Sequence, residues 1–494
     1  MKNRAVEYWL SIVLTLLMAA ADVEALEISK TFSVAEVQAE FDELYQRLES
    51  AHFNLYARRS KQEYRARFDR MRSQFDRPLT VAEIHSQFQS FVAYGKVAHA
   101  RIDGLQGAFS HYRQQGGKAL PVSVRVVADA MYIQDNYSGL GTLSPGDELL
   151  SLNGTPVAAL LEKAATQLSA DNDYMMQGLV ELWFPALMWQ QFGAMDRFTL
   201  VLRRDGGKPF VLSVPARTRP ESMATAATQT SLLELDWDKR EARILDPVEA
   251  GIGYLRPGPF YNNEPNATDV WDARPFIAFL DRAFNQFQSG GVKTLVIDLR
   301  DNPGGDNSFS DVMVSWFASK PYRFCSAFHI KVSDATSESN RKRVATSTDG
   351  SGDASRQFAA LYQRHKHGDI VDYQFPLVQP RTGSRFAGKV FLLINRRSYS
   401  NTVMVAALAQ DYGFATIVGE ETSDLATTYG AMEQFSLSRT GLTVGYPKAH
   451  IIRPNGSTDA RGVIPDLSIK TPVLESVDDP VLKETLRLIA GATR

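Results

Sequence analysis

The chain has 494 residues, with 54 Lys and Arg against 56 Asp and Glu, so its formal net charge is −2. A nearly neutral chain gives no electrostatic reason to expect a nucleic-acid partner. Its composition, 44% hydrophobic and 22% charged, is ordinary for a folded protein. The length indicates about three domains at ~100–200 residues each. The single cysteine, Cys325, excludes an internal disulfide and a cysteine-based metal cluster.

The N-terminus has the composition of a secretory signal peptide. Lys2 and Arg4 precede an apolar run that ends at Ala21, and small residues follow. This pattern predicts a signal peptide over residues 1–25, cleaved after Ala21 or Ala25. The apolar run is shorter than the ~20 residues of a membrane-spanning helix, and a retained amphipathic anchor is the alternative. We therefore expect an exported protein, periplasmic or extracellular, with no membrane span after cleavage.

Residues 30–103 are predicted to form a small helical subdomain. Apolar residues recur at three- and four-residue spacing in the segments 34–50, 61–75 and 80–95. In the third segment Thr80 is the expected N-cap, and Glu83, three residues on, completes a capping box.

Residues 118–217 have the pattern of short strands separated by turns. The expected strands are 122–127, 130–135, 147–154 and 197–204, with turn signals at "SPGDE" and "NGTP". The stretch "LSPGDELLSLNGTPV" resembles the segment of a PDZ domain that carries its signature turn and strand. PDZ domains bind extended peptides by adding a strand to an open sheet edge, so the resemblance implies recognition of a polypeptide tail. A small β-barrel-like module is the alternative.

After a Thr-, Ala- and Ser-rich connector, residues 247–494 alternate predicted strands with helices. The expected strands are 252–257, 293–300, 389–394, 415–420 and 441–447. The expected helices are 272–291, 308–320 and the segment that follows Ser400. Near-continuous apolar strands that alternate with helices predict an α/β domain whose sheet is buried on both faces. The polar, Gly- and Ser-rich stretch 333–357 is expected to be a surface excursion.

Two glycines follow a strand in the stretch "VIDLRDNPGG". Gly304 and Gly305 let the backbone approach a ligand closely with outward N–H groups, which hold a carbonyl oxygen as it becomes negatively charged. The alternative is a tight strand-to-helix turn that needs glycine for its positive φ. The pattern alone leaves both interpretations open.

Ser400 lies where an apolar strand leads into an apolar helix. A serine at this position is a good N-cap for the helix. The same geometry suits nucleophilic catalysis, because the N–H of Asn401 and the positive end of the helix dipole lie beside the hydroxyl. Asn401 together with Gly304 or Gly305 would then form a two-donor oxyanion hole.

The stretches "KTLVIDLRDNPGG" and "VFLLINRRSYSNTVMVAALAQDYGFATIVGEET" together resemble the tail-specific, or C-terminal-processing, serine peptidases and their tricorn relatives. The resemblance places Ser400 on the nucleophile and residues 410–413 on the stretch that closes its helix. It implies a ClpP/crotonase-like α/β peptidase core preceded by a helical subdomain and a PDZ-like module. The stretch "AHFNLYARRSKQEYRARF" fits the same layout, so the resemblance spans most of the mature chain.

One departure from the family concerns the base. Bacterial tail-specific members use a serine–lysine dyad, and Leu425 stands at the position of the lysine in this chain. The tricorn-like branch uses a histidine instead, and "FVAYGKVAHARIDG" places His99 at its site. An imidazole with its ordinary pKa of ~6.5 is largely neutral near pH 7, which suits a general base. The rival histidines are His52, His85 and His450.

The resemblance also implies a carboxylate that orients the histidine. The stretch "NGSTDARGVIPDL" is similar to the family's Glu-x-x-Gly-Val-x-Pro-Asp, which places Asp459 at the acid position. An aspartate is one methylene shorter than the family's glutamate, and Asp466 is the fallback. Asp298 and Arg300 are instead expected to hold the end of the sheet and its loop together.

The leading hypothesis is an exported serine peptidase in which Ser400 forms an acyl-enzyme with His99 as base. The substrate would be a polypeptide, and some tricorn relatives assemble into oligomers. No metal or organic cofactor is implied, because His-Glu-x-x-His, cysteine-pair and phosphate-loop motifs are absent from the sequence. The alternative is an inactive protein of the same fold that binds a peptide or a lipid-like ligand. The missing lysine, Asp459 and Ala98 favour this alternative.

Overall fold

A computed structural model of the chain describes residues 30–102, 104–226, 238–245, 251–265, 267–346, 353–474 and 478–491. The predicted signal peptide, residues 1–25, lies outside these ranges, as does Asp103. The chain divides into two compact units. The first contains residues up to 234 together with 434–446 and 472–479, and the second contains 235–433, 447–471 and 480–494.

The first unit begins with the predicted helical subdomain. Its helices are α2 (Val34–Ala51), α3 (Lys61–Ser73) and α4 (Val81–Ala93), and β1 (Thr31–Phe32) pairs with β2 (Leu79–Thr80). Each helix begins with a capping box, so the predicted box of Thr80 with Glu83 is confirmed. Aromatic rings from all three helices pack together in the core; they are Phe41, Tyr64, Phe68, Phe88 and Phe91.

The first unit continues with an antiparallel sheet of strand order β4-β5-β6-β8-β9. These strands are β4 (Val122–Val127), β5 (Ala130–Asn136), β6 (Glu148–Leu152), β8 (Arg197–Arg203) and β9 (Phe210–Pro215), and β7 (Thr155–Pro156) pairs with β6. All four strands predicted for this region are confirmed. The other elements nearby in sequence are β3 (Arg101–Ile102), α5 (Leu105–Gln114) and α8 (Arg219–Ala226).

Two helices in this region were not predicted. α6 (Val157–Ala165) and α7 (Asp173–Phe192) pack on the antiparallel sheet and share its apolar core. α7 contains Pro185 and buries residues around most of its circumference. It therefore lacks the one-sided apolar period by which a helix is predicted from sequence.

The second unit is built on a six-stranded sheet of order β10-β11-β12-β15-β16-β19. The strands are β10 (Glu241–Ile244), β11 (Ile252–Arg256), β12 (Thr294–Asp298), β15 (Lys389–Ile394), β16 (Thr416–Gly419) and β19 (Leu467–Ser468). All neighbours are parallel except β10 and β11. The predicted mixed α/β architecture is therefore confirmed.

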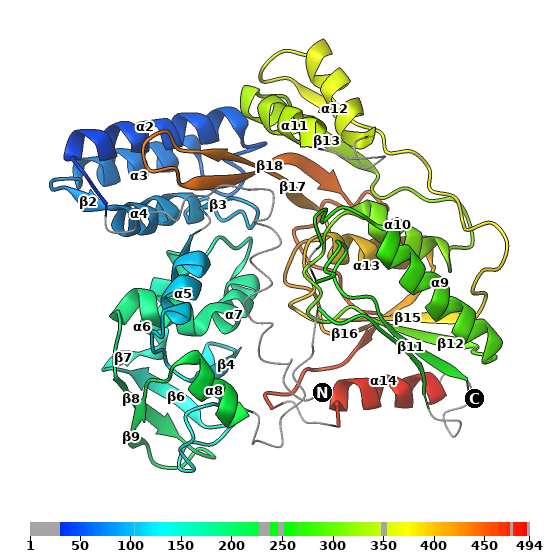
Figure 1. Cartoon of the computed structure of the whole chain (residues 1–494), viewed down its shortest axis with the longest axis horizontal. Helices are drawn as coiled ribbons and strands as arrows, with labels where there is room; N and C mark the ends of the chain where they lie inside the picture. The colour runs from blue at the N-terminus through cyan, green and yellow to red at the C-terminus, as the bar shows by residue number, and fades with distance from the viewer. Residues whose placement is uncertain are drawn as a thin grey trace. The chain divides into compact units, whose positions relative to one another are not determined.

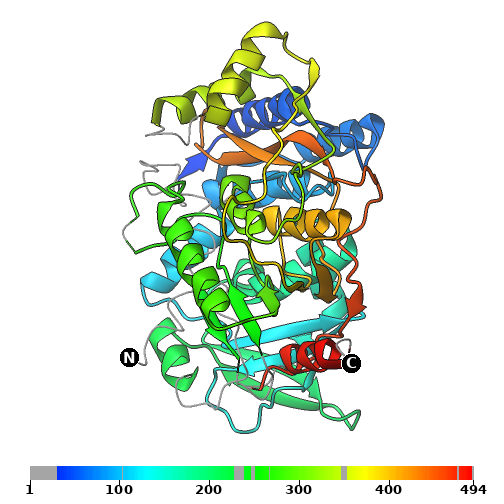
Figure 2. The ribbon, with the colours of Figure 1, turned by 90° about the vertical axis from the view of Figure 1, so that its right-hand side faces the viewer.

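Helices cover both faces of this sheet, as the apolar strands predicted. α9 (Arg274–Ser289), α10 (Asn307–Ser315) and α13 (Asn401–Tyr412) share the larger apolar core with one face. α14 (Pro480–Gly491), red in Figures 1 and 2, packs with the residues that point to the other face.

A second sheet has the order β14-β13-β18-β17. Its strands are β14 (Ile370–Asp372), β13 (Ala327–Lys331), β18 (Thr443–Ile452) and β17 (Thr428–Ser436), and β3 pairs with the start of β18. The stretch 333–357, expected to be a surface excursion, contains helix α11 (Asp334–Thr346) and the start of α12 (Asp353–Arg364). Arg343 of α11 anchors this segment, since its Nη1 lies 2.7 Å from the buried carboxylate of Glu433.

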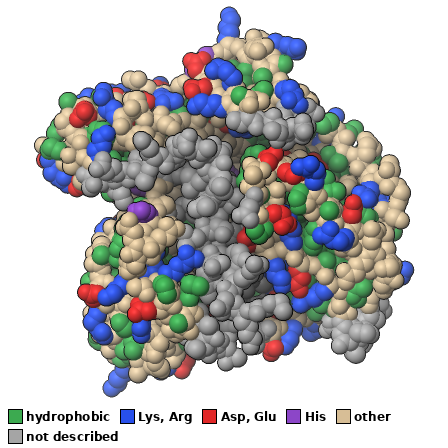
Figure 3. All heavy atoms as spheres, in the orientation of Figure 1, with side chains coloured by type: hydrophobic (Ala, Val, Ile, Leu, Met, Phe, Trp, Pro, Cys, Tyr) green, Lys and Arg blue, Asp and Glu red, His purple; other side chains and the backbone are tan. Residues whose placement is uncertain are grey.

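The surface carries both signs of charge. On the face shown in Figure 3, Lys and Arg side chains are interspersed with Asp and Glu, in keeping with the net charge of −2. Across the described ranges, no helix combines the length and apolar character needed to cross a bilayer. Cys325 is buried in the apolar cluster around β13, as expected for a small core residue.

Candidate active site

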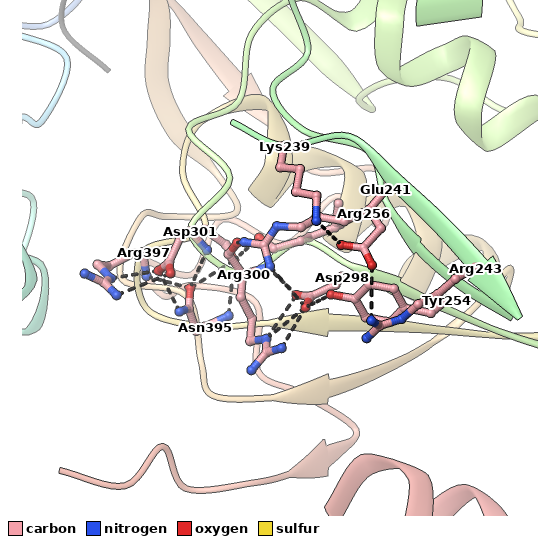
Figure 4. A network of polar contacts seen from close by, with 12 residues as sticks. Lys239, Glu241, Arg243, Tyr254, Arg256, Asp298, Arg300, Asp301, Asn395 and Arg397 are labelled. Carbon is pink, nitrogen blue, oxygen red and sulfur yellow. Dashed lines mark hydrogen bonds and ion pairs between the residues drawn. The ribbon is translucent and has the colours of Figure 1, made fainter. Parts of the chain in front are cut away.

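The parallel strands β12 and β15 run side by side, with Asp298 opposite Leu393, and they deliver two loops to one edge of the sheet. Asp298 ends β12 and is 1% exposed. Its Oδ2 accepts from Tyr254 at 2.8 Å and from Arg300 Nη2 at 2.7 Å, and Arg256 Nη1 lies 3.4 Å away (Figure 4). Burial would raise the pKa of Asp298, but the two guanidinium groups outweigh it and hold the pKa at about 2.

A second polar cluster joins the loop after β12 to the loop after β15. Arg397 Nε donates to Asp301 Oδ1 at 2.7 Å, and Asn395 Nδ2 donates to the same oxygen at 2.8 Å. The Asp301 N–H returns a bond to Asn395 Oδ1 at 3.1 Å. Figure 4 shows both clusters along the strand ends. The expectation that Asp298 and Arg300 hold the sheet end and loop together is therefore confirmed.

Asn302 ties the glycine loop to the helix that follows Ser400. Its Oδ1 accepts from the Gly304 N–H at 3.0 Å and from the Thr402 hydroxyl at 2.8 Å. Its carbonyl accepts from the Tyr399 N–H at 3.0 Å. The side chain is 2% exposed, so these bonds are shielded from water. Sequence reasoning did not single out Asn302, because two of its partners, Tyr399 and Thr402, lie about a hundred residues away in the chain.

Ser400 precedes α13 but does not cap it. Its side chain makes no capping hydrogen bond, and its backbone has φ 55° and ψ −123°. An N-cap residue has extended backbone, and its side-chain oxygen accepts a hydrogen bond from an N–H of the first turn, so the capping interpretation is wrong for Ser400. A serine held at positive φ on a sharp strand-to-helix turn presents its hydroxyl outward, as in a nucleophile elbow.

Gly304 and Gly305 lie directly against this turn and its neighbours. A Cβ added to Gly304 would lie 3.0 Å from the Ser400 Cβ and 2.8 Å from the Asn401 nitrogen. A Cβ on Gly305 would lie 2.2 Å from the carbonyl oxygen of Phe260. Both glycines have positive φ, 89° and 137°, so close packing and backbone conformation each require glycine.

The backbone donors around Ser400 are not equivalent. The Gly304 N–H is engaged by Asn302. Gly305 forms a parallel β-bridge with Phe260. The two hydrogen bonds of this bridge run from the Phe260 N–H to the Gly304 carbonyl and from the Asp306 N–H to the Phe260 carbonyl, so neither uses the Gly305 N–H. Asn401 is the first residue of α13, where an N–H has no partner within the helix.

Asp424 contacts Ser400 directly, and the sequence analysis did not identify it. Its side chain is fully buried, and its Oδ2 accepts from the Ser400 N–H at 2.6 Å. Its Oδ1 accepts from the Leu425 N–H at 2.9 Å. Leu425, which the sequence resemblance places at the lysine position, is itself buried. No local pattern marks Asp424, because the contact that defines it spans 24 residues of chain.

His99 belongs to the first unit. It is 5% exposed and sits in a turn between α4 and β3, which is the helix-to-strand junction predicted for it. The neighbouring Ala98 N–H donates to the buried carboxylate of Asp171 at 3.4 Å.

The rival histidines make structural contacts within their own units. His52 Nδ1 accepts from the Asn54 N–H at 3.1 Å, and His85 Nε2 lies 3.2 Å from the carbonyl of Ile102. The ring of His450 stacks on that of Tyr429, with centroids 4.8 Å apart.

Asp459 and Asp466, the two candidates for the carboxylate that orients the histidine, have different surroundings. Asp459 is exposed, and its Oδ2 accepts from the Ser457 hydroxyl at 2.9 Å. Asp466 accepts from the Ile417 N–H at 2.8 Å and from the side-chain amide Nε2 of Gln410 at 2.9 Å, so it ties α13 and β16 together. Among the described residues, no group of three or more His, Cys, Asp and Glu side chains is arranged to hold a metal ion.

Comparisons with known proteins agree on the fold of this site. Residues 252–469 match the model of peptidase family S41, from the start of β11 to just beyond β19. The structure of mature CPAF superposes with a TM-score of 0.62 at 16% identity, covering 88% of this chain and 92% of CPAF. CPAF in complex with lactacystin gives 0.62 at 15% identity, covering 92% and 97%. No curated protein sequence matches the chain.

The photosystem II D1 C-terminal processing protease also matches, with a TM-score of 0.44 at 15% identity, over 88% of this chain and 93% of that one. The match of residues 252–469 to peptidase family S41 supports a serine-type peptidase. Ser400, the glycine pair and the buried clusters all lie inside the matched range.

Proposed function

We propose that this protein is an exported serine peptidase with Ser400 as nucleophile and His99 as general base. The observation that carries the proposal is the backbone of Ser400, which holds an uncapped hydroxyl at positive φ beside Gly304. In the reaction, Ser400 Oγ attacks the peptide carbonyl while His99 takes its proton. His99 then protonates the leaving amine, and it activates the water that hydrolyses the acyl-enzyme.

The proposed oxyanion hole uses the N–H groups of Gly305 and Asn401. Gly304 was an equal candidate from sequence, but its N–H is committed to Asn302 at 3.0 Å. In this arrangement Gly304 allows the close approach to Ser400, and Gly305 supplies the donor. Two backbone donors aimed at the developing oxyanion are worth several kcal/mol in such reactions, about 3–4 kcal/mol for a single donor.

A lysine base is less well supported in the second unit. The position of the family lysine holds the buried Leu425. Lys448 is buried too, but its ammonium lies 2.6 Å from Glu433 Oε1 and over the ring of Phe358. We therefore propose the Ser–His arrangement of the tricorn-like branch, which rests on the resemblance around His99.

The third catalytic residue is proposed to be Asp459, again from the resemblance. Its exposure and its bond to Ser457 leave its carboxylate weakly held. Asp466, the fallback, is engaged by Ile417 and Gln410 and fits a structural role. Asp459→Asn should therefore lower activity less than His99→Ala.

Three further parts of the proposal rest on sequence alone. The signal peptide predicted over residues 1–25 supports export to the periplasm or the extracellular space. The PDZ-like segment supports recognition of a polypeptide tail by the module over 118–217. Assembly into oligomers is proposed from the tricorn relatives.

Covalent labelling with a fluorophosphonate tests the proposal, with hydrolysis of an unfolded protein as a second measurement. Wild type should be labelled and should cleave, whereas Ser400→Ala should do neither and His99→Ala should lose at least about 1000-fold in rate. Lactacystin, which CPAF binds in its solved complex, serves as a second probe. A folded wild type that takes up neither probe would instead be an inactive protein that binds a peptide or lipid-like ligand.

A further inference from the structure

Ser400 adopts a backbone conformation that a serine does not hold without support. Its φ of 55° and ψ of −123° lie outside the regions that residues with a side chain favour. Such conformations persist only where the surroundings over-determine them, and they gather at active sites. Since the hydroxyl makes no capping bond, the restraint has to act on the backbone.

Asp424 makes the contact that acts on this backbone. Its Oδ2 accepts from the Ser400 N–H at 2.6 Å, which is shorter than the usual N–H···O hydrogen bond. Its other oxygen accepts from the Leu425 N–H at 2.9 Å, which fixes the rotation of the carboxylate. The side chain is 0% exposed, so water does not compete for either bond.

The loop that carries Asp424 is itself anchored on two sides. Ser423 Oγ donates to the carbonyl of Arg396 at 2.6 Å, within the loop that leads to Ser400. Thr422 Oγ1 accepts from the Val463 N–H at 2.9 Å and donates to the Asp424 carbonyl at 2.9 Å. A Cβ on Gly462 would lie 1.9 Å from the Thr422 carbonyl oxygen, so only glycine fits against this loop.

We propose that Asp424 is a positioning residue for the nucleophile, which holds Ser400 at positive φ and so aims its hydroxyl at the substrate carbonyl. The inference rests on the proposed role of Ser400. The loop that supplies a lysine base in serine–lysine relatives would here supply a backbone anchor one residue earlier. The "RGVIPD" stretch gains a role as well, because Gly462 and Val463 brace this loop.

The test measures fluorophosphonate labelling of the purified full-length protein over a range of probe concentrations, for wild type, Asp424→Ala and Asp424→Asn. Asp424→Ala should lower the maximal labelling rate about 100-fold, since misplacement of a reacting group by about 1 Å has an effect of this size. The probe concentration at half-maximal rate should stay within about twofold of wild type. Asp424→Asn should lose about 10-fold, because one amide oxygen serves only one of the two N–H groups.

A matched control separates positioning from general loss of stability. Glu40 is 1% exposed in the first unit, and its Oε1 accepts from the N–H groups of Arg439 and Thr440, each at 2.7 Å. Glu40→Gln therefore removes a buried carboxylate that also holds two backbone N–H groups, and it should leave the labelling rate within about twofold of wild type.

The outcomes distinguish the two proposals. A wild type that is never labelled at Ser400 overturns the proposed function itself. Labelling of wild type and of Asp424→Ala at equal rates overturns the role of Asp424 alone. A parallel loss of rate in Glu40→Gln and Asp424→Asn also overturns it, because stability would then be the cause. If Asp424→Ala does not fold, the rate of the near-isosteric Asp424→Asn decides.

Discussion

Asp171 in the first unit and Asp298 in the second are both buried carboxylates, yet their pKa values shift in opposite directions. Burial raises the pKa of Asp171 to about 6, since the charge of Arg58 and the Ala98 N–H offset only part of the effect. Its Oδ1 has no hydrogen-bond partner in the described part of the chain. Asp298 has two guanidinium groups and a tyrosine hydroxyl around it, and its pKa falls to about 2.

The number of partners, rather than the depth of burial, separates these two carboxylates. A buried charge is stable only when it is paired and hydrogen-bonded, and otherwise it tends to take up a proton. In the second unit, paired charges lie at the ends of β12 and β15, where the loops that lead to Gly304 and to Ser400 begin. In the first unit, aromatic packing holds the helices together, and Asp171 is a local cost to stability.

The largest expected effect comes from breaking the paired carboxylate. Asp298→Asn leaves Arg256 and Arg300 without their counter-charge, so the free energy of unfolding at pH 7 should fall by about 3–5 kcal/mol. Chemical denaturation measures this. The exposed pair of Asp69 with Arg65 is the control, and Asp69→Asn should cost at most about 0.5 kcal/mol. Equal losses in the two variants would contradict the account.

The stability that Asp298 contributes depends on pH, and the direction follows from its lowered pKa. The folded-state pKa of Asp298 lies below the ordinary value of 3.8. The stability that Asp298 contributes is therefore present above about pH 4 and is lost as the pH falls from there through 2. The difference in stability between wild type and Asp298→Asn should shrink over that window.

The unpaired carboxylate should respond in the opposite way. The folded-state pKa of Asp171, about 6, lies above 3.8, so its cost to stability is absent below about pH 4 and grows until pH 6. At pH 7 to 8 the cost is roughly 3 kcal/mol, at 1.36 kcal/mol per pKa unit. Asp171→Asn should therefore raise the free energy of unfolding at pH 7 to 8 and leave it unchanged at pH 4. A variant less stable than wild type at pH 8 would show that the Asp171 carboxylate is stabilising.

A smaller effect tests whether the second unit also stores strain in its backbone. Ser400→Gly and Ser400→Ala both remove the hydroxyl, but only glycine adopts the φ of 55° without strain. Ser400→Gly should be more stable than Ser400→Ala by about 1 kcal/mol. This figure is net of the stability that glycine loses because it increases the conformational entropy of the unfolded chain. Denaturation of the two inactive variants under the same conditions measures the difference. Equal stabilities would mean that Ser400 is not strained.

Sequence predicted the parts of this fold that carry local signals. The capping box at Thr80 and the parallel strands around β12 and β15 depend on neighbouring residues, and they were found. α7 was missed because it is apolar on all sides, and α11 because its polar sequence looked like loop. In each case tertiary packing decided the structure over local preference.

In the candidate active site, too, only the features with a local sequence signal were predicted. The stretch around Ser400 identified its position, but capping and nucleophile interpretations share that position, and only the backbone φ separates them. Asn302 and Asp424 left no pattern, because their roles come from contacts with residues far along the chain. The pairing of Ser400 with His99 stays a prediction from the resemblance.

Peptide mapping of the fluorophosphonate-labelled wild type tests the central claim most directly, since it identifies the residue that carries the adduct. The account predicts one adduct, on Ser400, that disappears in His99→Ala on the timescale of wild-type labelling. An adduct on any other residue, or none on a folded protein, would contradict it.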